Sequence, residues 1–311
     1  MPSSTSSSEA VEVRPALTRA TWALLLCAVL VYAGAEGAAR FGLERLSQMH
    51  QRIMGQLRAS AALRPAPAGQ PKTILFAGNS LLNAGLDIDV LNAELQGRYQ
   101  PQRVIVEATN YYDWYYGLRR LFREGMRPDV VVVALYASQL RTDSIRGDFS
   151  SGFLFDLQDI WPMSRDTGAS LTRTSSYYAA HFSTFYAARS ELHAVLMGKL
   201  SPAVTTLWQH AILGSTVLPP DEILEAEFQP RLAALDQLCR QYGTQFIFLI
   251  PLTSGRGDTA TMKAGQKAGV RVLRALPNDS TTPDFFQADG FHLSQKGALL
   301  WTRAIAKALL Q

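Results

Sequence analysis

Short apolar runs alternate with amphipathic segments along most of the chain after residue 72. Residues 73–77 and 130–135 are continuous apolar runs, which is typical of strands buried on both faces. Further strands are expected at 104–108, 245–250 and 270–273, and helices at 86–95, 112–125, 220–242 and 295–310. This alternation predicts an α/β fold, in which a doubly wound parallel sheet of about five strands carries helices on both faces.

The alternation lapses between residues 141 and about 218. This stretch contains scattered glycines and many aromatic residues, and one helix is expected at 183–199. It follows the third predicted strand, and ligands bind at the carboxyl edge of open parallel sheets. We therefore expect a largely helical insertion at about 141–218, which either caps a ligand site or only adds packing.

The N-terminal part of the chain differs in composition from the rest. Residues 1–19 are largely polar and begin with a Ser-rich stretch, so a disordered cytoplasmic tail is expected there. Residues 20–35 are almost wholly apolar, which is shorter than the ~20 residues that cross a bilayer comfortably, and the segment could extend through 37–39. An uncleaved transmembrane anchor is favoured because the polar lead-in is long. A cleaved signal peptide is the alternative, since Ala33-Gly34-Ala35 has the small-x-small form of a cleavage site. A buried core helix is the third interpretation.

Residues 40–71 form the expected connection to the main domain. Apolar residues recur at helical spacing between charges over 40–65, and a Pro-rich stretch at 65–71 follows. We interpret 40–71 as a juxtamembrane helix and linker, and 72–311 as the catalytic domain. Arginines lie on both sides of the apolar segment, so charge alone does not set its orientation.

Composition excludes some classes of function. The formal net charge is +4 without a run of Lys or Arg, so no nucleic-acid partner is expected. The two cysteines, Cys27 and Cys239, provide neither a disulfide framework nor zinc-ligand spacing. We expect no metal and no cofactor.

Ser80 is the first candidate for chemistry. It follows an apolar strand, Gly78 and Asn79, at a point where a helix is expected to begin. Free N–H groups and the helix dipole at that end would favour negative charge beside the hydroxyl. A serine needs a base to act as a nucleophile. By itself, the Gly78-Asn79-Ser80 sequence favours a serine that only caps the helix.

His292 and Asp289 are the complementary candidates. His292 is the one histidine of five that has an acidic residue three positions before it and a helix expected just after it. Asp289 can orient the imidazole and stabilise its protonated form, as a nucleophilic serine requires. The fold would have to bring this loop to Ser80.

Taken together, Gly78-Asn79-Ser80-Leu81 and Asp289-Gly290-Phe291-His292 resemble the two terminal motifs of the SGNH or GDSL family of serine esterases and acyltransferases. The continuation, residues 293–297, is also similar to that family. The resemblance covers 72–311, interrupted by the insertion. It implies a flavodoxin-like sheet, Ser80 as nucleophile, and His292 and Asp289 as its partners. Asn79 departs from the family, which commonly has an acidic residue there.

The family's second and third motif blocks supply the oxyanion hole, and both diverge here. Asn110 and Gly117 are candidates in the second block, where the family uses a glycine N–H. Ser138 and Gln139 are candidates in the third block, where the family's Asn is missing. Loss of one oxyanion donor typically costs ~10²–10³ in rate, so these departures bear directly on activity.

Aromatic residues crowd positions 111–116. They could stack on sugar rings. Core packing is the more common use of such a cluster on an amphipathic helix.

Similar departures, together with an N-terminal membrane segment, occur in envelope relatives that move acyl groups onto polymers, such as the proteins of alginate acetylation and teichoic-acid D-alanylation. The resemblance implies a single-pass protein of the bacterial inner membrane, anchored by residues 20–39, with a periplasmic catalytic domain. Secretion after cleavage is the alternative. The implied substrate is an acyl ester, acetyl above all, of an envelope or exported glycan. A multi-span membrane acyltransferase is a candidate partner.

Two other classes of function compete with a serine esterase or O-acyltransferase. A non-catalytic glycan-binding or assembly subunit could keep the fold and lose the oxyanion hole. A flavodoxin-like nucleotide binder would need several glycines or hydroxyls in its first loop. Gly78-Asn79-Ser80 offers few of them, which disfavours nucleotide binding.

Overall fold

The computed structural model describes residues 15–189, 191, 217–253, 256–277 and 281–311. Its centre is a parallel sheet with the strand order β2-β1-β3-β4-β5. The strands are β1 (Lys72–Gly78), β2 (Tyr99–Ile105), β3 (Val130–Ala134), β4 (Gln245–Leu249) and β5 (Arg271–Leu273). This order is that of the flavodoxin-like doubly wound fold, whose switch point lies between β1 and β3. The α/β fold predicted from the sequence is confirmed.

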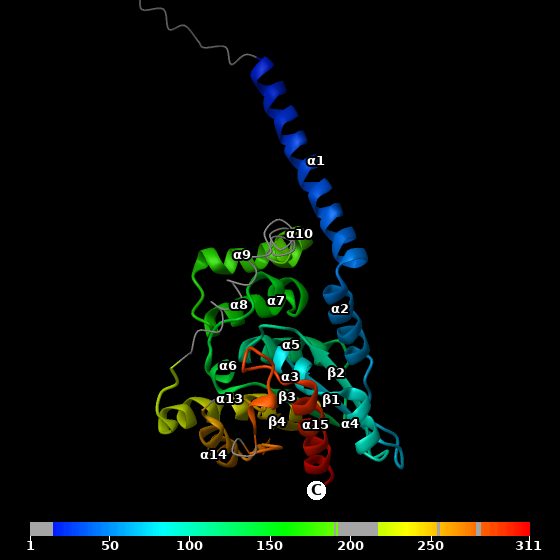
Figure 1. Cartoon of the computed structure of the whole chain (residues 1–311). Coiled ribbons are helices and arrows are strands. Elements are labelled where there is room, and N and C mark those ends of the chain that lie inside the picture. The colour runs from blue at the N-terminus through cyan, green and yellow to red at the C-terminus, as the bar shows by residue number, and fades with distance from the viewer. Residues whose placement is uncertain (1–14, 190, 192–216, 254–255, 278–280) are drawn as a thin grey trace, which may run out of the picture.

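Helices cover both faces of the sheet (Figure 1). One face packs against α2 (Gln48–Ala61), α5 (Tyr111–Arg123), α13 (Asp221–Gln241) and α14 (Asp258–Ala268). The other face packs against α3 (Ser80–Gly85), α4 (Ile88–Glu94) and α15 (Gln295–Leu310). Alternate residues of β1 enter the two cores: Leu75 and Ala77 join the first, Ile74 and Phe76 the second. This explains the uninterrupted apolar run in the sequence, because both faces of the strand are buried.

The structure corrects the predicted boundaries of three secondary-structure elements. The second strand was expected at 104–108, but β2 ends at Ile105, and Ala108 adopts a left-handed φ of 56°. The helix expected at 86–95 is α4, which begins two residues later, at Ile88, and a separate short helix, α3, precedes it. The juxtamembrane helix expected over 40–65 is two helices, because α1 (Pro15–Leu46) continues to Leu46 and Ser47 caps the start of α2.

α2 belongs to the folded domain, and the boundary predicted at 65–71 does not separate it from the core. Ile53 and Leu57 are buried in the first core. Two polar side chains of α2 also bind the open edge of β2. Gln56 Oε1 accepts from the Ile105 N–H at 2.9 Å, and Arg52 donates to the Ile105 carbonyl at 3.1 Å. The helix therefore occupies hydrogen-bonding groups that an edge strand would otherwise expose.

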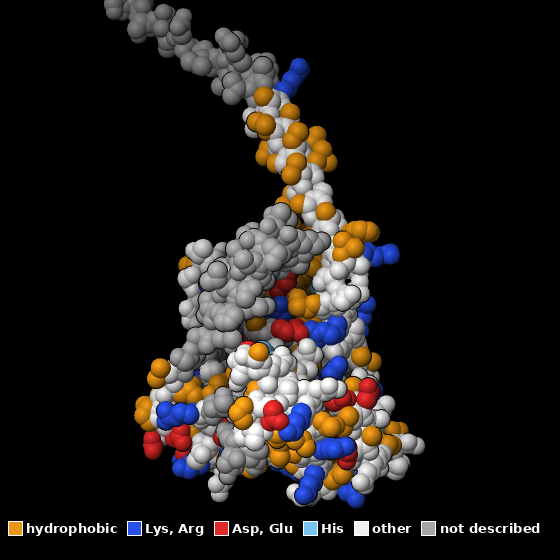
Figure 2. Space-filling view, viewed as in Figure 1, with side chains coloured by type: hydrophobic (Ala, Val, Ile, Leu, Met, Phe, Trp, Pro, Cys, Tyr) orange, Lys and Arg blue, Asp and Glu red, His pale blue; other side chains and the backbone are white. Residues whose placement is uncertain are grey.

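α1 projects away from the domain and carries apolar side chains along its length (Figures 1 and 2). Within the described residues, one helical stretch, Thr18–Leu46, is long and apolar enough to cross a membrane by length and composition. Only 6% of the most apolar part of this stretch is buried. A buried core helix is thereby excluded for this segment.

The insertion after β3 is helical in its described part. It begins with α6 (Ala137–Arg141) and continues through α7 (Asp148–Phe153), α8 (Leu157–Asp166), α9 (Leu171–Phe182) and α10 (Thr184–Ala187). These last four helices lie between the sheet and the projecting α1 (Figure 1). Most of the helix predicted at 183–199 lies outside the described residues.

Candidate functional site

Ser80 is the first residue of α3, two positions beyond β1. The fully buried Asn79 is its N-cap. Asn79 Oδ1 accepts from the Leu81 N–H at 3.1 Å, and Asn79 Nδ2 donates to the Thr109 carbonyl at 3.0 Å. These two bonds fix the turn that presents Ser80 against the segment that follows β2. Asparagine suits this position better than aspartate, because a carboxylate could not donate to a carbonyl.

Gly78 makes the sharp turn before Ser80 possible. A Cβ at this position would lie 2.9 Å from the Leu82 side chain and 3.0 Å from the Ala134 carbonyl. Both contacts are too close, so a larger residue would push α3 away from the sheet. The Ser80 N–H, in the first turn of α3, donates to no acceptor in the described part of the chain. It is therefore available to a ligand.

His292 lies beside Ser80, although 212 residues separate them. The His292 Nε2 atom is 3.0 Å from Ser80 Oγ, and the Nδ1 atom is 2.7 Å from Asp289 Oδ2. The structure thus brings together Ser80, His292 and Asp289, the three residues named from the two sequence motifs. The order hydroxyl, imidazole, carboxylate is the arrangement that lets an imidazole remove the hydroxyl proton.

The Asp289 carboxylate is held by its own loop. Its Oδ1 atom accepts from the backbone N–H groups of Phe291 at 2.9 Å and His292 at 3.0 Å. Partial burial by itself would raise the pKa of Asp289, but the hydrogen bonds from the His292 ring and from these two N–H groups outweigh it and lower the pKa. The carboxylate is therefore ionised at neutral pH, as a group that orients an imidazole must be.

α15 holds this loop against α3. The buried Thr302 hydroxyl donates to the Gly85 carbonyl at 3.1 Å and accepts from the Asp87 N–H at 3.0 Å. A Cβ on Gly85 would lie 2.7 Å from the Trp301 ring, so glycine permits this close approach. The helix after His292 is thus fixed to the helix that begins with Ser80. The distance between the two reacting groups is set by packing rather than by a free loop.

The four residues predicted as oxyanion donors differ in whether their N–H groups are free to bind a ligand. Gly117 is wrong: it lies in the second turn of α5, where its N–H belongs to the helix's own hydrogen bonding. Asn110 lies at the N-terminus of α5, but its N–H donates to Asp113 at 2.8 Å and its side-chain amide donates to the Ser144 carbonyl at 3.3 Å. Both kinds of donor on Asn110 already have protein partners.

Ser138 and Gln139 lie in the first turn of α6, which follows β3. Gln139 Oε1 accepts from the Tyr136 N–H at 3.0 Å, whereas its Nε2 donates to no described residue. The register of the sheet pairs Gly78 with Ala134, so the chain reaches α6 at the same edge as Ser80. Gln139 Nε2 and the first-turn N–H groups of α6 are the donors that remain on this side.

Two aromatic residues that the sequence analysis did not single out lie near the site: Phe291 lies beside the imidazole, and Tyr136 lies beside Phe291. The Phe291 ring packs edge-on against His292 and against Tyr136, with centroids 5.4 and 6.3 Å apart. Tyr136 is half-buried, and this burial raises the pKa of its hydroxyl even though the Arg256 N–H donates to it. The sequence marked these two residues by position alone. Phe291 directly precedes the candidate histidine, and Tyr136 closely follows a strand.

The insertion is joined to α5 through a buried carboxylate, Asp113. It accepts from the N–H groups of Asn110 at 2.8 Å and Arg146 at 3.0 Å, and from the Ser150 hydroxyl. Burial raises the pKa of Asp113 to about 6, although these hydrogen bonds oppose the shift. The insertion is therefore anchored one turn from the segment that contacts Asn79.

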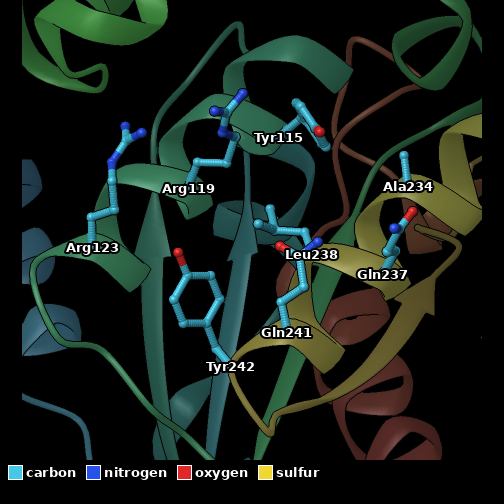
Figure 3. A pocket seen from close by; sticks show the side chains of 8 residues that line it. All are labelled: Tyr115, Arg119, Arg123, Ala234, Gln237, Leu238, Gln241 and Tyr242. Carbon is cyan, nitrogen blue, oxygen red and sulfur yellow. The ribbon is translucent and has the colours of Figure 1, made fainter.

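A polar cavity of about 320 Å³ lies elsewhere, between α5 and α13 (Figure 3). Tyr115, Arg119 and Gln237 are among its lining residues, and neither Ser80 nor His292 is.

Of the aromatic cluster at 111–116, Tyr111, Trp114 and Tyr116 are buried in the core. Packing therefore accounts for most of this cluster. In the part of the chain that the structure describes, no group of three His, Cys, Asp or Glu side chains could hold a metal ion.

Comparison of the sequence with protein-family models and with curated proteins gave no match. Among solved structures, one described as "Crystal Structure of TesA" is similar, with a TM-score of 0.39 and 15% sequence identity. The match covers 77% of this chain and 100% of that chain. Similarity at this level does not establish a family or an activity.

Proposed function

We propose that the protein is a serine esterase or O-acyltransferase that acts through an acyl-Ser80 intermediate. The observation that carries the proposal is the continuous chain of contacts from Ser80 Oγ through the His292 ring to Asp289. A serine that caps a helix needs no histidine on its hydroxyl and no carboxylate behind that histidine. The resemblance of the two sequence motifs to the SGNH family supports the same chemistry.

In the proposed reaction, His292 Nε2 takes the Ser80 proton while Oγ forms a bond to the acyl carbon. The carbonyl electrons move to oxygen, where the Ser80 N–H and a donor from the start of α6 stabilise the charge. The tetrahedral intermediate collapses, the ester bond breaks, and the protonated imidazole gives its proton to the departing alkoxide. Water or a sugar hydroxyl, deprotonated by His292, then attacks acyl-Ser80 and releases the enzyme.

We further propose that α1 anchors the protein in the bacterial inner membrane, with the main domain in the periplasm. The exposed apolar surface of Thr18–Leu46 supports a membrane segment. The acyl donor or acceptor would be an envelope or exported glycan, acetyl being the favoured group, and a multi-span membrane acyltransferase the candidate partner. These finer assignments rest on the resemblance stated above. Cleavage after residue 35 would release a secreted protein instead.

The decisive experiment is intact-mass analysis of the full chain in detergent after brief exposure to p-nitrophenyl acetate. We expect a 42 Da acetyl adduct on Ser80 and its loss in Ser80→Ala. Ser175→Ala, which changes an exposed serine on α9, is the matched control and should keep the adduct. An adduct that survives Ser80→Ala would refute the assignment.

A non-catalytic glycan-binding subunit is the second candidate. It is favoured by one observation, namely that both kinds of Asn110 donor are already occupied. This alternative predicts that no acyl ester yields an adduct, while binding of acetylated oligosaccharides is the same in wild type and Ser80→Ala. Any Ser80 adduct would exclude it.

A further inference from the structure

A cavity of about 640 Å³ lies where α1, α2 and the insertion meet, away from Ser80. Its wall includes Arg40, Glu44 and Arg45 of α1, His50 and Arg58 of α2, and Phe153 of α7. The proposed chemistry at Ser80 makes no use of these residues. We refer to this cavity as the junction groove.

The charge of the junction groove favours an anion. Three arginines line it against a single carboxylate, Glu44. Arg40 is engaged by Glu36, with Nε at 2.8 Å from the carboxylate. Arg45 and Arg58 form no ion pair with a residue in the described parts of the chain, and both are exposed. Two guanidinium groups are thus left to bind a ligand, and guanidinium geometry suits phosphate oxygens.

His50 provides an independent sign of a ligand. It is 7% exposed, yet its Nδ1 atom has no hydrogen-bond partner among the described residues. The ring is fixed by edge-on packing against Phe153, with centroids 5.0 Å apart. Burial lowers the pKa of His50, so the ring is neutral and presents one N–H donor and one acceptor. A buried polar atom without a partner is costly, and its retention is explained where a ligand completes its hydrogen bonding.

The junction groove lies at the end of the apolar part of α1. Glu36 accepts from the Ser183 hydroxyl at 2.9 Å, and from the N–H groups of Thr184 at 2.9 Å and Phe185 at 3.0 Å. These bonds hold the start of α10 against α1. The neighbouring Phe182 is 68% exposed. Exposed aromatic side chains beside the end of a membrane helix suit the headgroup layer of a bilayer.

We propose that the junction groove binds the phosphodiester headgroup of an anionic glycerophospholipid, through Arg45, Arg58 and His50. The proposal rests on that part of the proposed function which places α1 in a membrane, and it is independent of the chemistry at Ser80. Basic pockets beside membrane helices are a recognised means of binding such headgroups. A bound lipid would hold the domain in one orientation on the membrane.

The test is native mass spectrometry of the full chain in detergent, titrated with phosphatidylglycerol or with zwitterionic phosphatidylcholine. We expect one phosphatidylglycerol to bind in preference to phosphatidylcholine. Arg45→Gln and Arg58→Gln should each weaken the affinity for phosphatidylglycerol about five-fold. Both positions are exposed, so these changes do not threaten folding. Lys263→Gln, which removes an exposed cation on the remote α14, is the charge-matched control and should bind as wild type.

His50→Phe keeps the aromatic contact with Phe153, removes the ring nitrogens, and should also weaken phosphatidylglycerol binding. Equal binding of the two lipids, or unchanged binding in the double variant Arg45→Gln/Arg58→Gln, would overturn the proposal. So would displacement of the lipid by millimolar inorganic phosphate, which would indicate a free phosphate site. Ser80→Ala should bind the lipid normally. A full chain that stays soluble without detergent would instead contradict the proposed membrane anchor.

Discussion

Asp289→Asn tests the proposed mechanism most sharply, because the loop dictates which amide atom faces the imidazole. Asp289 Oδ1 accepts from two backbone N–H groups, at 2.9 and 3.0 Å. In the asparagine variant the amide oxygen must keep this place, since an NH₂ group cannot accept. The NH₂ group then faces His292 Nδ1 across the 2.7 Å contact that Oδ2 now makes.

An NH₂ donor at this position forces His292 Nδ1 to act as the acceptor. The single ring proton then moves to Nε2, which faces Ser80 Oγ at 3.0 Å. A protonated Nε2 cannot take the serine proton, so kcat should fall by ~10⁴, as expected for a triad held in the wrong tautomer. Both backbone hydrogen bonds are kept, so the free energy of unfolding should change by less than about 1 kcal/mol.

The assay is the steady-state release of p-nitrophenol from p-nitrophenyl acetate, with denaturant unfolding measured on the same samples. Asp284→Asn is the matched control, because Asp284 is an exposed carboxylate that pairs with Lys296 rather than with His292. It should retain wild-type kcat. If Asp289→Asn keeps more than a tenth of wild-type kcat while folded, the assigned role of Asp289 is refuted.

Three further predictions follow from the contacts around the site. Asn79→Asp should lower stability by about 2–4 kcal/mol in urea unfolding, because it buries a charge and removes the donor to Thr109; an unchanged midpoint would contradict this. Gln139→Ala should lower kcat ~10²-fold or more with little change in KM, whereas Ser138→Ala should have a small effect; the reverse order would assign the donor to the serine. Burial raises the Asp113 pKa from 3.8 to about 6, so the folded chain holds a proton that the unfolded chain loses, and the free energy of unfolding should fall by up to about 3 kcal/mol as pH rises through this window. Asp113→Asn should remove that slope, and an equally steep slope in the variant would refute the cause.

The strands were predictable where both faces are buried, whereas β2, at one edge of the sheet, was misplaced. β1, β3 and β4 consist of apolar residues along almost their whole length. β2 is an edge strand whose first half alternates polar residues with Pro101, and only its end is fully buried. Its apolar signal therefore pointed to residues after the strand, where Ala108 already turns with positive φ.

The nucleophile, base and acid were predictable because each carries a local signature. Asp289 and His292 are three residues apart and hydrogen-bond within one loop, and Ser80 follows a strand directly. The oxyanion donors carry no such local signature in the sequence. Whether Asn110 faces a substrate or Ser144 depends on how the insertion folds over α5, which no local pattern encodes. Gly117 was misjudged because its place in a helix, rather than its residue type, decides whether its N–H is free.

α2 was misjudged because its buried face is narrow. His50, Ile53, Leu57 and Ser60 are its buried residues, and the rest of the helix is largely polar. The same spacing fits a helix lying on a membrane surface. Only the bonds from Gln56 and Arg52 to Ile105 show that the helix is part of the sheet's architecture.

Those bonds limit how the chain can be shortened. A version that starts at the Pro-rich stretch near residue 65 would lack α2, and the N–H and C=O groups of β2 that now bind Gln56 and Arg52 would face solvent. Bare strand edges recruit the strands of other molecules, so such a fragment should self-associate for reasons unrelated to its lost membrane helix. A version that begins at Ser47 would lack the apolar helix α1 but would keep α2, whose side chains bind the edge of β2.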